Sequence, residues 1–329
     1  MFAFVISRIL QGIPVVLVVG LLAFAMFAFV GDPVASMLGQ TYTEAQRAAL
    51  VHTLGLDQPF YLQYLHYMWR ALHGNFGFSY RLASPVSLLI AQRFPATFEL
   101  TLTATVLSLL IGLPMGVYTG LHRNSWLSRG FMVFSLAGIS LPTFLTGILL
   151  ILIFSVVLGW LPSFGRGGVV NFSHWSTGFL TISGLKSLIL PAITLGLFQT
   201  TLIVRLVRAE MLEVLRSDYI KFARARGLPK RAVNFGHALK NTLVPVITII
   251  GIQIGQLLAF TIVTETVFQW PGMGLLLVQS IAVSDIPVMS AYLLMVAVFF
   301  VIINLLVDLL YLVVDPRLRV ERRLAGAVR

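Results

Sequence analysis

The sequence predicts an all-α integral membrane protein that crosses the bilayer about six times, and three observations support this prediction. The 329 residues are 58% hydrophobic and only 11% charged, whereas a water-soluble domain carries roughly 25% charged residues. Six apolar runs are each long enough to cross the hydrocarbon, which takes roughly 20 helical residues. Lysine and arginine cluster in alternate connections between these runs, as expected when cations are kept on one side of a membrane.

The expected spans cover residues 9–30, 96–121, 131–160, 188–207, 244–268 and 288–314. Backbone N–H and C=O groups find no water in the bilayer core, so each run is expected to form a helix. The first run is longer than the roughly 7–15 apolar residues of a signal peptide, so we expect it to be retained as a span. The third is long enough to be tilted, or broken at Pro142.

The positions of the cations predict the orientation. Of 23 Lys and Arg residues, 17 fall on one side: Arg8, the turn with Arg123 and Arg129, nine from Arg205 to Lys240, and five from Arg317 to Arg329. This side is expected to be cytoplasmic, with both termini on it. The net charge of +11 therefore indicates membrane topology and contact with lipid, and we expect no nucleic-acid partner.

Two outer segments are large enough to fold, residues 31–95 and 161–187. In the first, Trp69, Phe76 and Phe78 supply apolar area that could cap the outer mouth of the protein. The stretch from Pro85 to Phe94 is interpreted as a short amphipathic helix at the membrane interface.

The composition excludes several kinds of chemistry. The chain has no cysteine and its six histidines form no HxxxH pair, so no metal site is predicted. No Gly-Lys pair occurs, so there is no phosphate-binding P-loop. No histidine lies inside an expected span, which argues against a membrane-embedded hydrolase. We predict no catalytic residues and no cofactor bound by this chain.

The expected cytoplasmic loop, residues 208–243, is the most informative segment. Asp218 is predicted to cap a short helix that begins at Tyr219, with Ala223 and Ala225 small enough for a close approach. Gly227 would end that helix, and a second helical piece would run from Lys230 to Lys240, before Pro245 opens the fifth span. Two interpretations remain open: a docking site for a partner, or a basic loop attracted to anionic lipid.

Polar residues inside the expected spans are few, so each is a candidate site. Glu99 and Asp308 are expected at headgroup level, paired with a cation or capping backbone. Glu265 adjoins the outer loop without cations and could instead meet a substrate ammonium group. One stripe of the fifth expected span carries Gln253, Gln256, Phe260 and Thr264. Its two amide side chains would be costly to expose to lipid, so we expect the stripe to contact another helix or to line a pathway through the membrane.

Glycines recur at four-residue steps in two of the expected spans. The positions are Gly112, Gly116 and Gly120 in the second span, and Gly251 and Gly255 in the fifth. This spacing lets two helices approach closely, so we expect helix packing, with a seam between two subunits as the alternative.

These segments resemble a known family. The run from Asp218 to Leu228, followed by His237 to Asn241 and Pro245, is similar to the cytoplasmic loop of ABC importer permeases of the dipeptide/oligopeptide type. Further ordered similarities extend along nearly the whole chain: Gly31 to Pro33, Leu54 to Pro59, Phe94 to Leu100, Glu265 to Phe268, Pro271 to Gly274, Asn304 to Tyr311 and Asp315 to Arg317. The long first outer loop resembles that of the first of the two permeases in such systems.

The resemblance implies the type I ABC importer permease fold in the bacterial inner membrane. It implies that the loop around Gly227 forms a coupling helix seated on an ATPase subunit, with Asp218, Tyr219, Phe222, Ala223, Ala225, Gly227 and Leu228 as the coupling segment. It further implies a second homologous permease, two ATPase subunits that bind ATP and magnesium, and an extracytoplasmic solute-binding protein. Peptide is the expected substrate, with nickel complexes, glutathione or opine-like solutes as alternatives.

A self-contained secondary transporter is the competing class. Such proteins usually show an internal repeat or acidic residues at mid-membrane depth for ion coupling. The two halves of this sequence show no convincing repeat, and no acidic residue falls in the middle of an expected span.

Overall fold

The computed structural model describes residues 2–29, 34, 38, 43–54, 56–173 and 175–314. The described elements are α1 (Phe2–Phe29), α3 (Glu44–Leu54), α4 (Phe60–Leu72), β1 (Phe78–Ser79), β2 (Ser84–Pro85), α5 (Val86–Leu121), α6 (Trp126–Ser140), α7 (Thr143–Leu150), the π-helical η1 (Ile151–Val157), β3 (Val170–Phe172), β4 (Trp175–Thr177), α8 (Ile182–Val214), α9 (Asp218–Ala225), the π-helical η2 (Ala232–Leu239), α10 (Lys240–Val267), α11 (Met273–Ala282) and α12 (Ile286–Val314).

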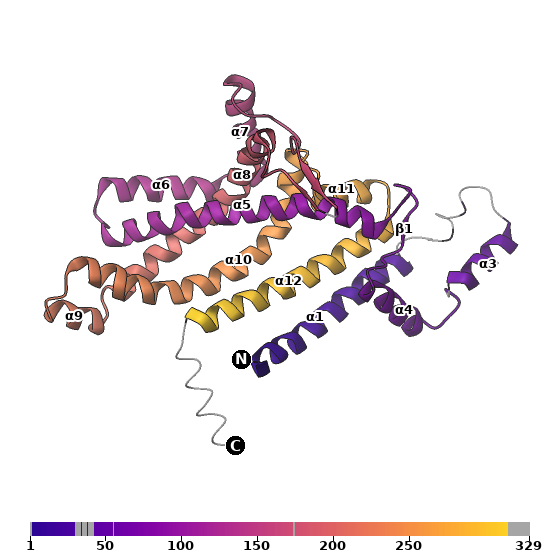
Figure 1. Ribbon diagram of the computed structural model, residues 1–329, viewed down its shortest axis with the longest axis horizontal. Helices are drawn as coiled ribbons and strands as arrows, with labels where there is room; N and C mark the ends of the chain where they lie inside the picture. The colour runs from indigo at the N-terminus through magenta and orange to yellow at the C-terminus, as the bar shows by residue number, and fades with distance from the viewer. Residues whose placement is uncertain are drawn as a thin grey trace, which may run out of the picture.

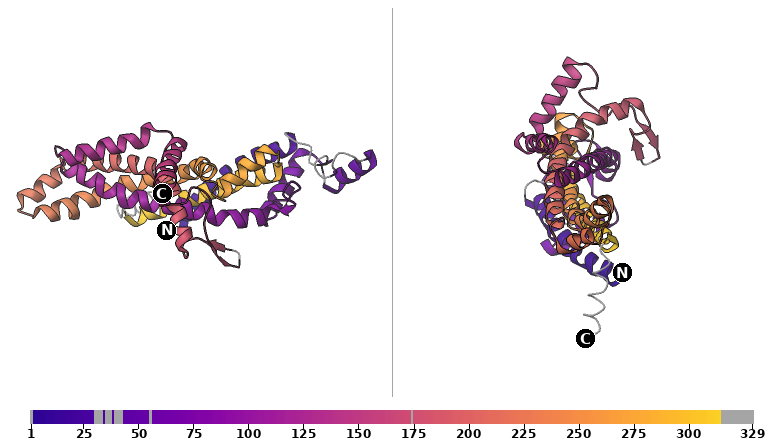
Figure 2. Two further views of the ribbon diagram at one scale, coloured as in Figure 1. Left: turned by 90° about the horizontal axis from the view of Figure 1, so that it is seen from above. Right: turned by 90° about the vertical axis from the view of Figure 1, so that its left-hand side faces the viewer.

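Helices α1, α5, α10 and α12 run side by side along the long axis of the molecule (Figure 1). Helix α8 packs against both α5 and α10 at the centre, and α1 packs against α12 at one edge. Helix α9 lies at one end of the bundle, and α11 and the β1–β2 hairpin lie towards the other (Figures 1 and 2). The strand pairs β1–β2 and β3–β4 are each short and antiparallel.

Five described helices are long and apolar enough to span a membrane, and a bent pair raises the number to six. The pair is α6 followed by α7 and η1, which meet at an angle of 109°. The bend falls at Leu141 and Pro142, because the residue before a proline disfavours helical geometry and proline lacks an N–H to continue the ladder. A break at Pro142 was one of the two expectations for this run.

Two helices extend well beyond the expected spans. Helix α5 begins at Val86, so the stretch expected as a separate interfacial helix is the first part of α5. Val86 and Ile90 are buried there against Met273 and Leu276 of α11. This tertiary packing keeps the helix continuous through Pro95.

The expected cytoplasmic loop is also largely helical. Helix α8 continues to Val214, and η2 leads directly into α10 at Lys240. Pro245 therefore lies inside a helix and does not open it. Only α9 and two short connections stand outside the long helices, so the loop presents one compact helix at the end of the bundle.

Candidate coupling surface and buried polar clusters

Helix α9 begins one residue earlier than expected. Ser217 occupies the N-cap position, and its hydroxyl donates to the Val214 carbonyl (2.6 Å) and does not cap α9. Asp218 lies in the first turn, where a carboxylate is favourable beside the helix N-terminus. Its carboxylate accepts a hydrogen bond from Lys221 Nζ at 2.8 Å. That hydrogen bond and the lysine charge hold the pKa of Asp218 below its ordinary value.

Helix α9 ends in a Schellman motif centred on Gly227. The Gly227 N–H donates to the Arg224 carbonyl (3.0 Å), and the Leu228 N–H donates to the Ala223 carbonyl (3.3 Å). Gly227 has φ +77°, the left-handed conformation that this motif requires and that glycine adopts without steric cost. A Cβ at this position would meet no atom of the described chain within 4 Å.

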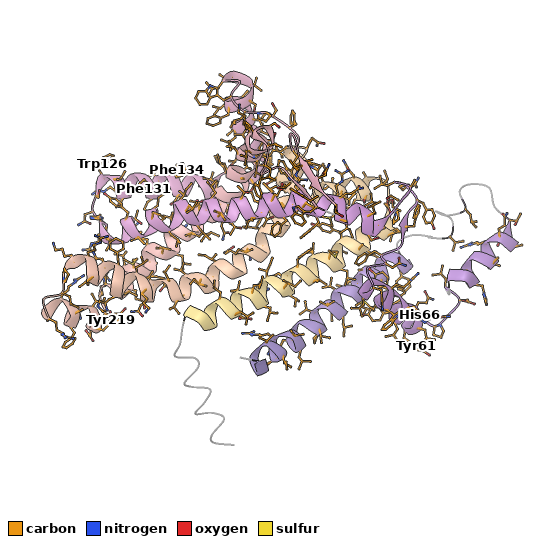
Figure 3. All side chains as sticks on the ribbon, in the orientation of Figure 1. Tyr61, His66, Trp126, Phe131, Phe134 and Tyr219 are labelled. Atoms are coloured by element: carbon orange, nitrogen blue, oxygen red, sulfur yellow. The ribbon has the colours of Figure 1, made fainter. Side chains whose placement is uncertain are left out.

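One face of α9 is fixed to the bundle and the other is open. Ile220 and Ala223 are buried in a cluster with Met211, Val233 and Ala238. The open face exposes Tyr219 (44% exposed) and Phe222 (64%), and Leu228 (37%) is exposed in the turn that follows α9. Figure 3 shows Tyr219 at this end of the molecule.

The expected coupling segment is therefore divided between the two faces. Ala223 faces the protein's own core and supports α9 from behind, while Ala225 is exposed beside Phe222. The Arg226 guanidinium lies 5.8 Å from the centre of the Phe222 ring, so the open face combines apolar area with positive charge.

Glu265 lies in a buried polar cluster at the other end of the bundle. Its carboxylate accepts hydrogen bonds from Thr97 Oγ1 (2.6 Å), the Gly274 N–H (2.7 Å) and the Leu275 N–H (3.0 Å). The N–H donors belong to the first turn of α11, where a negative charge is favourable. Trp270 adds a link to α5, because its indole N–H donates to the Ala96 carbonyl at 2.9 Å.

This geometry places Glu265 in contact with helices of its own chain. The side chain is 0% exposed, and its carboxylate is committed to α5 and α11. It has no open side towards a substrate in this structure. Thr264 is also buried, at 1% exposure, and its hydroxyl finds no hydrogen-bond partner within the described residues.

A second buried cluster joins Glu99 of α5 to the loop before α8. Arg166 donates to Glu99 Oε2 through Nη2 (2.7 Å) and Nε (3.1 Å). Ser176 accepts from the same guanidinium through its hydroxyl and its carbonyl, and the Gly178 N–H donates to Glu99 Oε1 at 3.0 Å. Both charged side chains are almost fully buried, at 7% and 2% exposure. Glu99 is thus paired with a cation, but in the protein interior.

The remaining polar candidates lie apart from these clusters. Asp308 pairs with Arg8 of α1 at 2.9 Å, in line with the expected pairing with a cation. On α10, Gln256 is exposed and Gln253 is half-buried. Phe260, at 42% exposure, continues this face, whereas Thr264 and Glu265 lie on the buried side. The structure therefore separates the two glutamines from the other two pathway candidates.

Both sets of glycines lie at helix contacts within this chain. A Cβ on Gly112, Gly116 or Gly120 would lie 2.8 Å, 2.6 Å or 2.7 Å from the nearest side-chain atom of Ile203, Val207 or Met211 of α8. Gly251 and Gly255 face Val307 and Phe300 of α12 in the same way. These glycines therefore pack helices of one subunit together.

Sequence reasoning missed the residues that complete the two clusters. Thr97 is a threonine in an apolar run, and Arg166 lies in a glycine-rich loop, so neither carries a local signal. A third buried contact, between the Ser79 hydroxyl and Asp285, was missed for the same reason. An acidic residue in an apolar run implies a buried partner, but it does not say which residue that is.

Comparisons with known proteins place the chain among transport components. Residues 112–320 match the family described as "Binding-protein-dependent transport system inner membrane component". Residues 1–101 match the N-terminal region described for the same kind of component.

Two relatives align along almost their full length. The chain is 42% identical to the di/tripeptide transport system permease protein DppB of Pseudomonas aeruginosa, covering 98% of this chain and 100% of the relative. It is 40% identical to the dipeptide transport system permease protein DppB of Escherichia coli K12, covering 97% and 99%.

A solved structure shares the fold. The inward-facing MetNI methionine ABC transporter aligns with a TM-score of 0.56 at 19% identity, over 69% of this chain and 96% of that chain. At this identity the similarity concerns the arrangement of helices.

Proposed function

Because this chain belongs to the family of binding-protein-dependent transport system inner membrane components, we propose that it carries peptides across the bacterial inner membrane as the permease subunit of an ATP-driven importer. Its fold is that of a type I importer permease. The relatives named above, which align along nearly the whole chain, are permeases for dipeptides and for di- and tripeptides. They favour short peptides over nickel complexes, glutathione or opine-like solutes.

The open face of α9 is the proposed seat of an ATPase subunit. The main evidence is the exposure of Phe222. Its aromatic side chain is 64% exposed at the basic end of the molecule. Such exposure to water is unfavourable, and the side chain is suited to a pocket on a partner protein. Ile220 and Ala223 hold α9 against the bundle, so a force applied to Phe222 moves the bundle and not α9 alone.

The proposed mechanism keeps ATP chemistry in separate subunits. Two ATPase subunits bind ATP and magnesium, and their closure and reopening move α9. A solute-binding protein delivers the peptide at the opposite end of the bundle. The permease alternates between openings to the two sides, and its own residues break no bond.

A second homologous permease would complete the pathway. The open face of α10 carries Gln256 between the apolar side chains of Ile249 and Phe260. An amide facing lipid lacks hydrogen-bond partners, so this face is better covered by a partner helix or by a wet pathway between two subunits. We assign this face to the pathway between two different permeases, with peptide backbone groups as partners for the glutamines.

The first test is co-purification with matched variants. We expect the tagged chain to bring down a second permease and P-loop ATPases from its native membrane. The F222A substitution should reduce ATPase recovery severalfold, since it removes the exposed aromatic side chain that we propose fits a pocket on the ATPase subunit. F172A is the matched control, because Phe172 is similarly exposed (54%) but lies in the β3–β4 hairpin, outside α9. Recovery of the chain alone, with ATP-independent peptide movement in vesicles, would contradict the proposal in favour of a secondary transporter.

The second test concerns the turn after α9. Gly227→Val should uncouple ATP hydrolysis from uptake, because a β-branched residue is strained at φ +77°. Gly227→Asn should retain most coupling, because asparagine tolerates this conformation and no atom of this chain obstructs its Cβ. Normal uptake with Gly227→Val would contradict the coupling role.

A further inference from the structure

Helix α4 has three distinct sides, although it lies in a segment expected to form an outer cap. One side packs on α1 through a cluster that includes Tyr67 and Met68. A second side is polar, and Gln63 on it donates to the carbonyls of Leu56 (3.0 Å) and Gln58 (2.7 Å). The third side is apolar and uncovered. It carries Tyr61 (62% exposed), Leu65 (57%), Trp69 (65%) and Leu72 (75%).

We propose that α4 is embedded in the membrane leaflet opposite α9, with this third side against lipid acyl chains. The charge pattern assigns this leaflet as the outer one. The side consists of residues at steps of four, four and three along the helix, so it forms one continuous stripe. We call Tyr61, Leu65, Trp69 and Leu72 the lipid stripe.

The depth of α4 follows from its contacts on α1. The Tyr64 hydroxyl donates to the Leu17 carbonyl at 2.7 Å, and Met68 lies against Gly20. The apolar stretch of α1 that is long enough to cross a membrane has Met26 at its described end, nine residues beyond Leu17. At a rise of 1.5 Å per residue the Leu17 carbonyl is about 14 Å along α1 from that end, within the ~15 Å half-thickness of the hydrocarbon. Helix α4 therefore reaches hydrocarbon depth.

The lipid stripe continues an apolar surface that α1 already exposes. Among described elements α1 packs mainly against α12 and α4. Its uncovered side carries Val18 (58% exposed), Leu22 (60%) and Phe29 (76%). Phe29 stacks on Phe60, the first residue of α4, with ring centres 5.8 Å apart. The exposed surface of a membrane span and the lipid stripe thus belong to adjoining, packed helices.

The composition of α4 suits this position. Tyrosine and tryptophan are enriched where hydrocarbon meets headgroups, because their rings are apolar and their polar atoms reach water. His66 and Arg70 border the lipid stripe on the side of Gln63, where headgroups and water would meet them. Figure 3 shows Tyr61 and His66 on α4 at the periphery of the bundle, away from α9. A role for Trp69 in capping the central mouth does not suit this placement.

The test is spin-label accessibility in liposomes containing the full chain with its co-purified partners. The chain has no cysteine, so Leu65→Cys introduces its only thiol, and the unsubstituted chain serves as the blank for partner thiols. Leu72→Cys is a second site on the lipid stripe. Val18→Cys is the reference for lipid, and Asn171→Cys, on the exposed β3–β4 hairpin, is the reference for water.

We expect labels at Leu65 and Leu72 to relax severalfold more with oxygen, which concentrates in hydrocarbon, than with a water-soluble nickel chelate, as the Val18 label does. Accessibility to nickel like that of Asn171 would place the stripe in water and overturn the proposal. Inaccessibility to both reagents, with an immobilised spectrum, would mean that another protein covers the stripe, and would overturn it equally.

Discussion

The contact between α5 and α8 leads to a sharp prediction about a single methyl group. A Cβ added at Gly116 would lie 2.6 Å from Val207 Cβ and 3.1 Å from the Val204 carbonyl oxygen. Neither neighbour is the far end of a flexible side chain, so the two helices must separate by about 1 Å to reach normal contact. Overpacking of this kind costs about 1–3 kcal/mol, partly offset by the ~1 kcal/mol by which alanine favours a helix over glycine.

The assay compares G116A with G130A. Gly130 is also helical, but a Cβ there meets no described atom within 4 Å, so G130A should be neutral or stabilising by up to ~1 kcal/mol. We expect G116A to unfold at a lower temperature or denaturant concentration in detergent, with its free energy of unfolding about 1–2 kcal/mol below that of the native chain.

A double substitution tests whether the contact with Val207 causes the loss of stability in G116A. Val207→Gly removes the side chain that obstructs residue 116 and leaves only the 3.1 Å approach to the Val204 carbonyl oxygen, so adding G116A to that background should cost much less than in the native chain. The two changes should therefore show a coupling energy of about 1–3 kcal/mol, as contacting residues do. Equal stability of G116A and G130A, or independent effects of the two changes, would refute the close approach of these helices.

Three further changes test the polar contacts. T97V removes a donor to Glu265 and should cost about 1–3 kcal/mol in free energy of unfolding, and an unchanged thermal midpoint would mean that the cluster is rearranged. R166M leaves the Glu99 carboxylate buried without its cation and should cost about 3–5 kcal/mol, whereas adding E99M should recover most of the loss. In contrast, Y64F removes one hydrogen bond to α1 and should cost only about 1 kcal/mol in the same unfolding assay.

The sequence predicts the helices well because apolar run length is a strong, local signal. Each expected range overlaps a described helix, although the range 131–160 includes the break before α7 and runs past the end of η1 at Val157. That break at Pro142 follows from the chemistry of one residue. The continuity of α5 from Val86 into the span could not be predicted in this way. Pro95 resembles a boundary, and the helix continues past it only because Val86 and Ile90 pack against α11, nearly 200 residues further along the chain.

The candidate sites show the same limit. The spacing of Gly112, Gly116 and Gly120 predicts close packing, but it does not identify α8 as the neighbour. Likewise, the acidic character of Glu265 marks it as unusual, while its partner Thr97 is 168 positions away. Periodicity places Phe222 and Ala223 on different faces of α9, yet only the folded bundle shows that the face of Ala223 is the covered one.

The close packing of Gly112, Gly116 and Gly120 of α5 against α8 has a mechanical consequence. Helix α8 is 33 residues long, about 50 Å, and only three residues separate it from α9. Because α8 packs closely on α5 from Gly196, which lies against Ala104, to Met211, which lies against Gly120, the pair can act as a stiff lever. A tilt of about 10° around the midpoint of α8 would shift each tip by about 4 Å. A small displacement of α9 can thus move the opposite end of α8, at the far side of the membrane, without any helix having to bend.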